Sequence, residues 1–230
     1  DAIEMVNQQR VLEAFWSERV STRHFAPTTG YGYDDIGRDT LDRVFARAIH
    51  AEKALVRPHF VNGTHAIFTA LAGIVEPGNR IVSITGEPYD TLLEAIGTRG
   101  DAPNSLKRFG VAFQAISLTA DNAIDLNALA KLSDNSVRVI YAQRSRGYAW
   151  REAITMAQLK TALEQVRALF PDAIILIDNC YGEFVEAMEP TMMGADLIAG
   201  SLIKNPGGGL ATTGGYIAGG EDYIDRIAQR

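Results

Sequence analysis

Cysteine is nearly absent from this 230-residue chain, and its single cysteine, Cys180, cannot form an internal disulfide. Chains without disulfides are typical of reducing compartments, so we expect a cytoplasmic protein. Histidine is also scarce, with four residues scattered along the first third of the chain. Neither residue type recurs at the short spacings of metal ligands, so we expect no metal site.

Long apolar runs and an excess of positive charge are missing as well. No apolar stretch approaches the roughly 20 residues that cross a bilayer, and no charged-then-apolar signal peptide pattern occurs. The net charge is −6, whereas a nucleic-acid-binding surface is basic. The hydrophobic share of 47% and the charged share of 22% are those of an ordinary globular protein. We expect neither a membrane nor a nucleic acid as a partner.

Short apolar runs rich in Ile and Val alternate with helical patterns along most of the chain. This alternation predicts βαβ units and an α/β fold with a mostly parallel, doubly wound sheet. Helices are expected over residues 2–20, 38–49, 66–75, 90–97, 125–132, 155–169 and 221–230. Strands are expected over residues 54–61, 80–85, 111–118, 137–143, 173–178 and 196–201.

The chain is expected to divide at a glycine-rich stretch over residues 24–37. Residues 1–37 are predicted to be an N-terminal helix with this irregular segment, and residues 38–230 one large domain. The chain closes on a predicted helix with no capping glycine after it, so we expect a small C-terminal domain in addition.

The carboxyl ends of parallel strands are where ligands bind in such sheets, and polar residues gather at several of them. Gly63 lies in the turn that leads from a predicted strand into a helix, where backbone N–H groups can bind phosphate, although it can equally be a plain turn residue. Asp178 ends a wholly apolar strand. A carboxylate buried there needs a cation such as a protonated pyridine nitrogen, or else it caps the following turn.

A lysine and two arginines complete this set of polar strand ends. Lys204 follows an apolar strand and precedes three glycines, which let the backbone approach a planar ligand closely. A lysine in such a place can serve as an amine nucleophile, and the alternative is a solvated loop lysine. Arg144 and Arg146 can bind phosphate or carboxylate, or they can pair with Glu152 or Asp178.

Taken together, these residues resemble the fold-type-I pyridoxal-phosphate (PLP) enzymes of the cysteine and methionine metabolism branch. The subgroup that they resemble contains aluminium-resistance proteins described as cystathionine β-lyases, which are similar to methionine γ-lyases. The resemblance runs over nearly the whole chain. Its most specific stretches are 29–35, 62–67, 143–148, 178–184 and 200–209.

The resemblance implies a PLP cofactor and three catalytic residues. Lys204 matches the lysine that binds the cofactor as a Schiff base. Asp178 matches the acid that keeps the pyridine nitrogen protonated, so that the ring acts as an electron sink. Tyr89 matches the aromatic residue that stacks on the ring, and this tyrosine often has an acid/base role as well.

The remaining cofactor-binding residues implied by the resemblance surround the phosphate. Gly63 and Thr64 match a backbone N–H cradle, and Ser201 matches a hydroxyl donor. Tyr33 matches a tyrosine that a neighbouring subunit lends to the phosphate, which implies a homodimer or a homotetramer with shared active sites.

Three departures from the family pattern affect this site. Ile203 replaces a threonine that usually precedes the lysine, and Asp35 stands where an arginine usually contacts the phosphate. Arg144 or Arg146 is a candidate for the missing cation. The arginine that binds the substrate carboxylate belongs to the small C-terminal domain, which the 230 residues do not include.

The function expected from the resemblance is that of a PLP-dependent carbon–sulfur lyase acting on a sulfur-containing amino acid, by β- or γ-elimination. Transamination, racemisation and replacement stay open, because all of them use the same lysine and aspartate. A PLP-fold stress protein without lyase activity also stays open. A nucleotide-binding domain that uses residues 62–64 is disfavoured, because no GxGxxG or GxxxxGK[ST] motif occurs at that turn.

Overall fold

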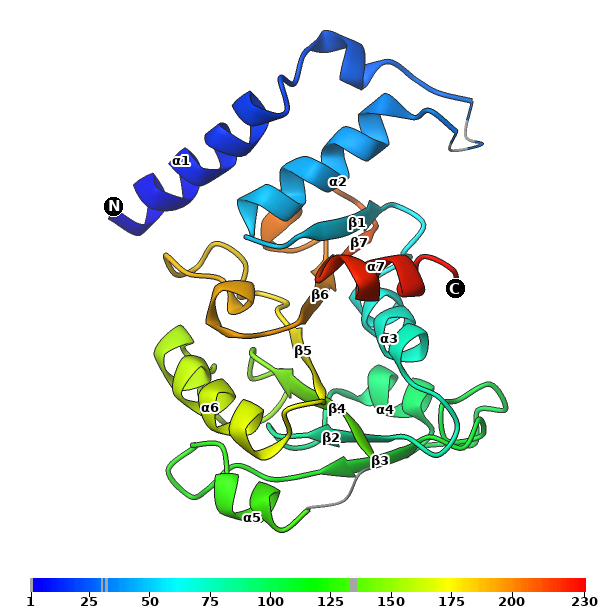
Figure 1. Ribbon diagram of the computed structural model, residues 1–230, viewed down its shortest axis with the longest axis vertical. Helices are drawn as coiled ribbons and strands as arrows, with labels where there is room; N and C mark the ends of the chain where they lie inside the picture. Colours follow the sequence, from blue (N-terminus) through cyan, green and yellow to red (C-terminus); the bar gives the residue numbers. More distant parts are fainter. Residues whose placement is uncertain (1, 30, 32, 133–135) are drawn as a thin grey trace.

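The computed structural model describes residues 2–29, 31, 33–132 and 136–230, so Gly30 and Gly32 of the predicted glycine-rich stretch lie outside the described residues. Seven strands form one sheet in the order β1-β7-β6-β5-β4-β2-β3 (Figure 1). The strands are β1 (Lys53–Arg57), β2 (Arg80–Ser83), β3 (Ala112–Ala115), β4 (Val137–Gln143), β5 (Ile174–Asp178), β6 (Leu197–Ser201) and β7 (Gly215–Gly219).

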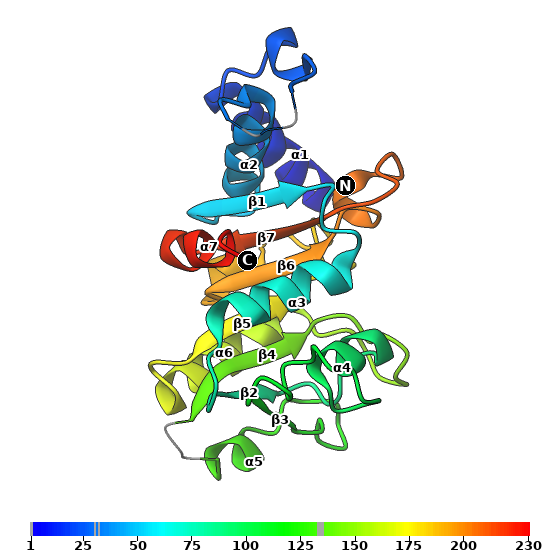
Figure 2. The ribbon, with the colours of Figure 1, turned by 90° about the vertical axis from the view of Figure 1, so that its right-hand side faces the viewer.

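Helices cover both faces of this sheet (Figures 1 and 2). One apolar core contains residues of α2, α5 and α6, and the other contains residues of α3, α4 and α7 together with the opposite sides of the strands. The helices are α1 (Ala2–Ser17), α2 (Ile36–Ala48), α3 (Gly63–Ile74), α4 (Asp90–Ile96), α5 (Leu126–Ala130), α6 (Met156–Leu169) and α7 (Glu221–Ile227). Short 3-10 turns occupy Thr22–Phe25, Pro190–Met193 and Asn205–Gly207.

Strand pairing makes the sheet mostly parallel, which confirms the predicted α/β fold class. Strands β3, β2, β4, β5 and β6 pair in parallel, and only β7 runs against its neighbours β6 and β1. Strand β5 lies at the centre with all five residues buried, which explains its unbroken apolar sequence up to Asp178. The carboxyl ends of β4, β5 and β6 therefore meet at one edge.

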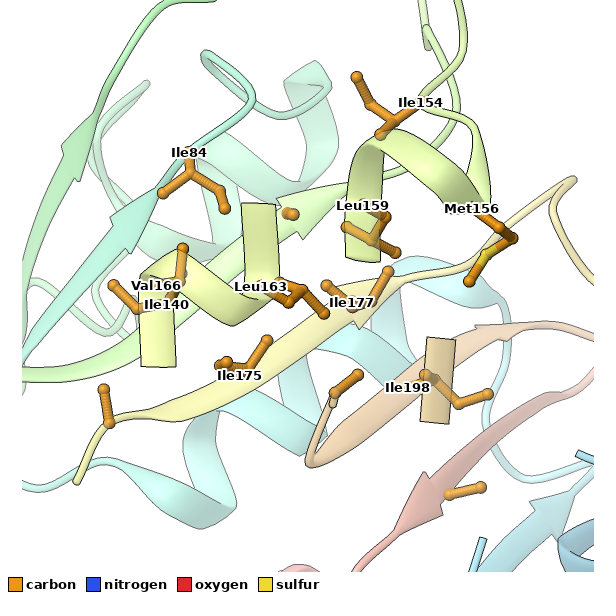
Figure 3. Packing of buried hydrophobic residues seen from close by; sticks show 14 of the residues in the cluster. Ile84, Ile140, Ile154, Met156, Leu159, Leu163, Val166, Ile175, Ile177 and Ile198 are labelled. Atoms are coloured by element: carbon orange, nitrogen blue, oxygen red, sulfur yellow. The ribbon is translucent and has the colours of Figure 1, made fainter. Parts of the chain in front are cut away.

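The packing of α6 on the sheet shows how the central strand is held in place (Figure 3). Thr155 begins the helix with a capping box, because its hydroxyl accepts a hydrogen bond from the N–H of Gln158. Leu159 and Leu163 of α6 pack in the same core cluster as Ile177 of β5, and each is at most 1% exposed. Burying each such side chain contributes about 1.5–3 kcal/mol, so α6 fixes the position of β5 firmly.

Two expectations for the strands were wrong. The first strand ends at Arg57 instead of residue 61, because Pro58 has no N–H to donate to the neighbouring strand. Gly63 therefore follows a loop and not a strand end. The antiparallel strand β7 was not predicted, because its sequence holds only three residues between two glycines. The N-terminal helix also ends at Ser17, three residues earlier than expected.

Candidate active site

The carboxyl ends of β5 and β6 bring together most of the residues predicted for the site. Asp178 is the last residue of β5 and Ser201 the last of β6, and these two strands are neighbours. Lys204 lies three residues beyond Ser201, close enough to Asp178 for their charges to interact. Helix α3 packs on β6 in front of the sheet (Figure 2), so its first residue, Gly63, reaches the same place.

Asp178 is a buried carboxyl group with two neutral donors. It is 1% exposed, its Oδ1 accepts from the N–H of Cys180 at 3.0 Å, and its Oδ2 accepts from the hydroxyl of Tyr141 at 3.2 Å. Burial raises the pKa of Asp178, while these bonds and the charge of Lys204 only partly offset that effect. A further cation beside this carboxyl group would lower its pKa and favour the carboxylate.

The amino group of Lys204 lies over the ring of Tyr181, with Nζ 4.2 Å from the ring centroid. Burial lowers the pKa of Lys204, whereas Cys180, Asp178 and Tyr181 raise it, and the net direction is upward. Burial and the charge of Asp178 raise the pKa of the Cys180 thiol, so this thiol stays neutral. Lys204 is therefore a partly buried ammonium group next to one carboxyl group and one aromatic face.

Tyr89 precedes α4 on the α3 side of the site, and its phenol is mostly buried. Burial raises the pKa of Tyr89 strongly, and the charge of Asp178 adds to this effect while the Thr64 hydroxyl acts against it. The Thr64 hydroxyl also lies 3.1 Å from the hydroxyl of Thr91. Tyr89 is consequently a protonated phenol that can donate a hydrogen bond or a proton.

The start of α3 and the end of β6 form a small cradle of free donors. The Asn62 side chain accepts from the N–H of His65 at 2.9 Å, but the N–H groups of Gly63 and Thr64 have no acceptor within the described residues. The Ser201 hydroxyl is buried and has no hydrogen-bond partner among them either. Three unsatisfied donors at a helix N-terminus suit an anion such as a phosphate group.

The close contact between α3 and β6 depends on Gly63. A Cβ atom added there would lie 3.1 Å from the Ser201 Cβ and 3.3 Å from the Cys180 Sγ. Any larger residue would push the helix start away from the strand ends. The cradle thus suits a phosphate group, Asp178 suits a pyridine nitrogen, and Lys204 suits an aldehyde. We conclude that these residues fit PLP.

The two arginines that follow β4 have different positions. The Arg144 guanidinium is buried, and its partners include the Glu186 carboxylate at 2.5 Å and the carbonyl of Gly182 at 2.7 Å. The acidic partner of Arg144 is therefore Glu186. The sequence suggested Glu152 or Asp178 instead. Arg146 is exposed on the rim of a cavity of about 440 Å³ that Tyr89 also lines.

Tyr33 does not join the other predicted site residues within the chain. It lies in the loop before α2 and is 86% exposed. The nearby Asp35 caps α2 by accepting from the N–H of Arg38 at 3.0 Å, and it also accepts from the Thr28 hydroxyl. This capping role explains why an acid stands at Asp35.

Sequence reasoning missed three residues that touch the site. Tyr141 is a lone tyrosine in the apolar strand β4, where it donates to Asp178. A buried tyrosine hydroxyl usually has a hydrogen-bond partner, and this was the signal in the sequence. Cys180 and Tyr181 lie inside a stretch that was noted only for its likeness to a family. The left-handed backbone of Tyr181, with φ of +66°, has no signal in the sequence.

Neither a cluster of metal-ligand side chains nor a membrane-spanning helix occurs among the described residues. No group of three His, Cys, Asp or Glu side chains there is placed to hold a metal ion. In the same ranges no helix has both the length and the apolar character needed to cross a membrane.

Comparisons with known proteins agree with this geometry. The methionine gamma-lyase family model matches residues 1–230. The protein YnbB of Bacillus subtilis is 48% identical over 225 residues, which cover 97% of this chain and 53% of YnbB. A solved carbon–sulfur lyase involved in aluminium resistance from Clostridium novyi is 49% identical with a TM-score of 0.95, over 99% of this chain and 54% of that one.

A more distant structure shows the fold alone. The pyridoxal-5'-phosphate-dependent protein YhfS of Escherichia coli is 20% identical, with a TM-score of 0.71 over 99% of this chain and 58% of that one. The chain spans about half the length of the relatives that it matches.

Proposed function

The chain belongs to the methionine gamma-lyase family, and from this premise we propose that the intact protein is a PLP-dependent carbon–sulfur lyase acting on a sulfur-containing amino acid. The observation that carries the proposal is the meeting of three features at one sheet edge. These are a buried carboxyl group at Asp178, an amino group at Lys204, and a cradle of unsatisfied donors that includes the buried Ser201 hydroxyl.

Each of these residues has a defined task in the proposed site. Lys204 binds the cofactor covalently through Nζ, and the N–H groups of Gly63 and Thr64 bind the phosphate together with the Ser201 hydroxyl. Asp178 sets its carboxylate against the pyridine nitrogen and keeps it protonated, since that cation offsets the cost of burying the carboxylate.

The elimination itself requires proton transfers that this chain can perform. When bound, PLP supplies an electron sink for the charge that develops on the substrate Cα. The Nζ of Lys204 would take the Cα proton, because the lysine lies in the site where the reacting carbon would be held. Tyr89 would stack on the ring, and its phenol, which burial keeps protonated, would assist the departing sulfur by donating a hydrogen bond. With the uptake of one water molecule, the products are a thiol, ammonia and an α-keto acid.

We further propose that the active protein is a homodimer or a tetramer of dimers. The segment around Tyr33 supports this proposal, because it exposes three large aromatic side chains. Phe25 is 76%, Tyr31 is 82% and Tyr33 is 86% exposed. Exposed aromatic groups of this size commonly mark an interface, and Tyr33 would reach the phosphate of the neighbouring subunit. Gel filtration coupled to light scattering tests this, and an active monomer would contradict it.

A substrate screen tests the lyase activity. The full-length protein, saturated with PLP, is given cystathionine, methionine, homocysteine and cysteine in turn, and the release of thiol and α-keto acid is measured. We expect both products from at least one of the four. Tyr89→Phe should still bind the cofactor but turn over more slowly, because it keeps the ring and loses the hydroxyl. Only amino-group transfer, or no reaction with any of the four, would contradict the lyase proposal.

A further inference from the structure

The turn that follows β5 holds two bulky residues in a strained backbone conformation. Tyr181 has φ of +66° and Phe184 has φ of +60°, in the left-handed region that residues other than glycine seldom occupy. Such residues persist only where the surroundings hold them, and they gather at functional sites. Tyr181 is itself 61% exposed, so its own burial does not hold it against Lys204. Something else must fix this turn.

Arg144 makes several of the contacts that fix the turn, and Asn7 and Asn205 also donate to its backbone carbonyls. The Arg144 guanidinium is 4% exposed, and it donates to the Asn179 side-chain oxygen at 3.1 Å, the Gly182 carbonyl at 2.7 Å and the Glu186 carboxylate at 2.5 Å. These acceptors bracket Tyr181 on both sides. The backbone N–H of Arg144 also donates to the carbonyl of Asp178 at 3.0 Å, so one residue connects β4 to the whole turn.

The sequence of the turn is adapted to this guanidinium. A Cβ atom added at Gly182 would lie 2.6 Å from the Nη1 of Arg144 and 2.5 Å from the Oδ1 of Asn179. Both distances are too short for real atoms, so only glycine permits the approach. The guanidinium has the planar set of donors needed for three acceptors in different directions, which a lysine does not have.

We propose that Arg144 is a positioning residue of the active site, which holds the turn 179–186 so that the Tyr181 ring faces the amino group of Lys204 and favours its protonated form. This inference rests on the proposed function. It gives Arg144 a task different from binding the cofactor phosphate, because the guanidinium donates to the turn and, through Nε, to the carbonyl of Ile154. Arg144 acts through Tyr181 and does not itself touch Lys204.

The groups that face Lys204 determine what should be measured. They are Asp178, Cys180 and Tyr181. Asp178 and Cys180 are held by β5 and by burial, whereas Tyr181 depends on the turn. A cation over an aromatic face is stabilised enough to raise its titration midpoint by about 0.5–1 pH unit. Displacing the Tyr181 ring should therefore lower the midpoint for the Lys204 nitrogen by that amount.

The experiment follows the visible absorption of the full-length holoenzyme as a function of pH, because this spectrum reports protonation of the Lys204 nitrogen. The variants are Arg144→Lys, Tyr181→Leu, Tyr181→Phe and the double variant Arg144→Lys/Tyr181→Leu. We expect Arg144→Lys and Tyr181→Leu each to lower the midpoint by about 0.5–1 pH unit. The double variant should shift no further, because both changes remove one contact. Tyr181→Phe keeps the ring and should match the wild type.

A matched control tests whether any arginine near β4 would have the same effect. The Arg151 guanidinium donates to the carbonyls of Gln143 at 2.9 Å and Ser145 at 2.5 Å, but it does not bind the turn 179–186. Arg151→Lys should therefore leave the midpoint at the wild-type value.

Several outcomes would overturn the proposal. A pH midpoint at the wild-type value in Arg144→Lys is one such outcome, and midpoint shifts that add in the double variant are another. The proposal also fails if Arg151→Lys shifts the midpoint as much as Arg144→Lys, or Tyr181→Phe as much as Tyr181→Leu. A wild-type protein without any visible cofactor band would instead contradict the proposed function. Thermal unfolding of each variant checks that the measured protein is folded, and Tyr181→Leu, on an exposed ring, tests the contact even where Arg144→Lys is poorly folded.

Discussion

Two neighbouring polar regions at the carboxyl edge of the sheet differ in how well their donors and acceptors are satisfied. The cradle between α3 and β6 leaves the buried Ser201 hydroxyl and the N–H groups of Gly63 and Thr64 without acceptors among the described residues. The turn after β5 is the opposite, since nearly every polar group near Arg144 has a partner. Unsatisfied buried donors indicate a place where a ligand binds, whereas the satisfied groups of the turn hold the backbone beside that place.

The turn contains one exception to this contrast. One carboxylate oxygen of Glu183 accepts from the Tyr216 hydroxyl at 2.7 Å, but the other is buried with no partner among the described residues. Burial raises the pKa of Glu183 to about 7, with the charges of Asp178 and Glu189 adding to that effect. Protonation of Glu183 removes the charge that burial penalises, while the second oxygen keeps no partner among the described residues.

Lys204→Ala is expected to have the largest effect, because it removes the covalent bond to the cofactor. The cradle contributes only non-covalent contacts to the phosphate. Turnover should fall by several orders of magnitude, while the phosphate donors still bind the cofactor non-covalently. Borohydride reduction followed by peptide mapping checks the link, with the label expected on Lys204 in the wild type and absent in the variant. A label on Lys107 or Lys160 would show that the wrong lysine has been chosen.

Asp178→Asn is expected to have the second largest effect, and it tests the carboxylate that ends β5, directly before the turn. The amide keeps the shape but cannot balance a protonated pyridine nitrogen, so turnover should fall by about 100- to 1000-fold, as for other preorganised electrostatic groups. Steady-state kinetics with saturating cofactor measure this. Asp178→Glu should also be impaired, because its longer side chain misplaces the carboxylate. Near-native turnover of Asp178→Asn would mean that Asp178 only caps the turn.

Glu183→Gln tests the one group of the turn that needs a proton. A carboxyl group whose pKa is raised from 4.5 to about 7 on folding binds more protons in the folded state, so it makes stability fall as the pH rises through that window. The loss is about 1.4 kcal/mol per pH unit at most. Urea unfolding at pH 5 and pH 7 should show a smaller loss in Glu183→Gln than in the wild type. An unchanged difference would place the titrating group elsewhere.

Ser201→Ala is the mildest change and sharpens the contrast between the two regions. Loss of one hydroxyl donor should weaken cofactor binding by about 10- to 100-fold, the value of a hydrogen bond to a charged group. Without cofactor the variant should unfold at the same urea concentration as the wild type or a higher one, because the hydroxyl has no partner to lose. A destabilised cofactor-free variant would mean that the Ser201 hydroxyl stabilises the fold itself.

Much of the site could be predicted because its signals are local. Asp178 and Lys204 each follow an apolar run, and Gly63 begins a helical pattern, so short-range periodicity was enough to place them at ligand-binding ends of the fold. Strand β7 was missed because five residues with two glycines carry too little pattern. The roles of all the predicted site residues stay predictions, and that of Tyr33 further depends on a partner in another subunit.

The sequence by itself determined the α/β class, the parallel strands with their boundaries in the centre of the sheet, and the residue types at the strand ends. These depend on backbone propensity and on apolar spacing over a few residues. Only the tertiary structure decided that Arg144 pairs with Glu186, 42 residues later, that Glu183 meets Tyr216, and that Tyr181 turns its ring to Lys204. Such pairings depend on how distant segments pack together, and packing between segments leaves no periodic mark on either one.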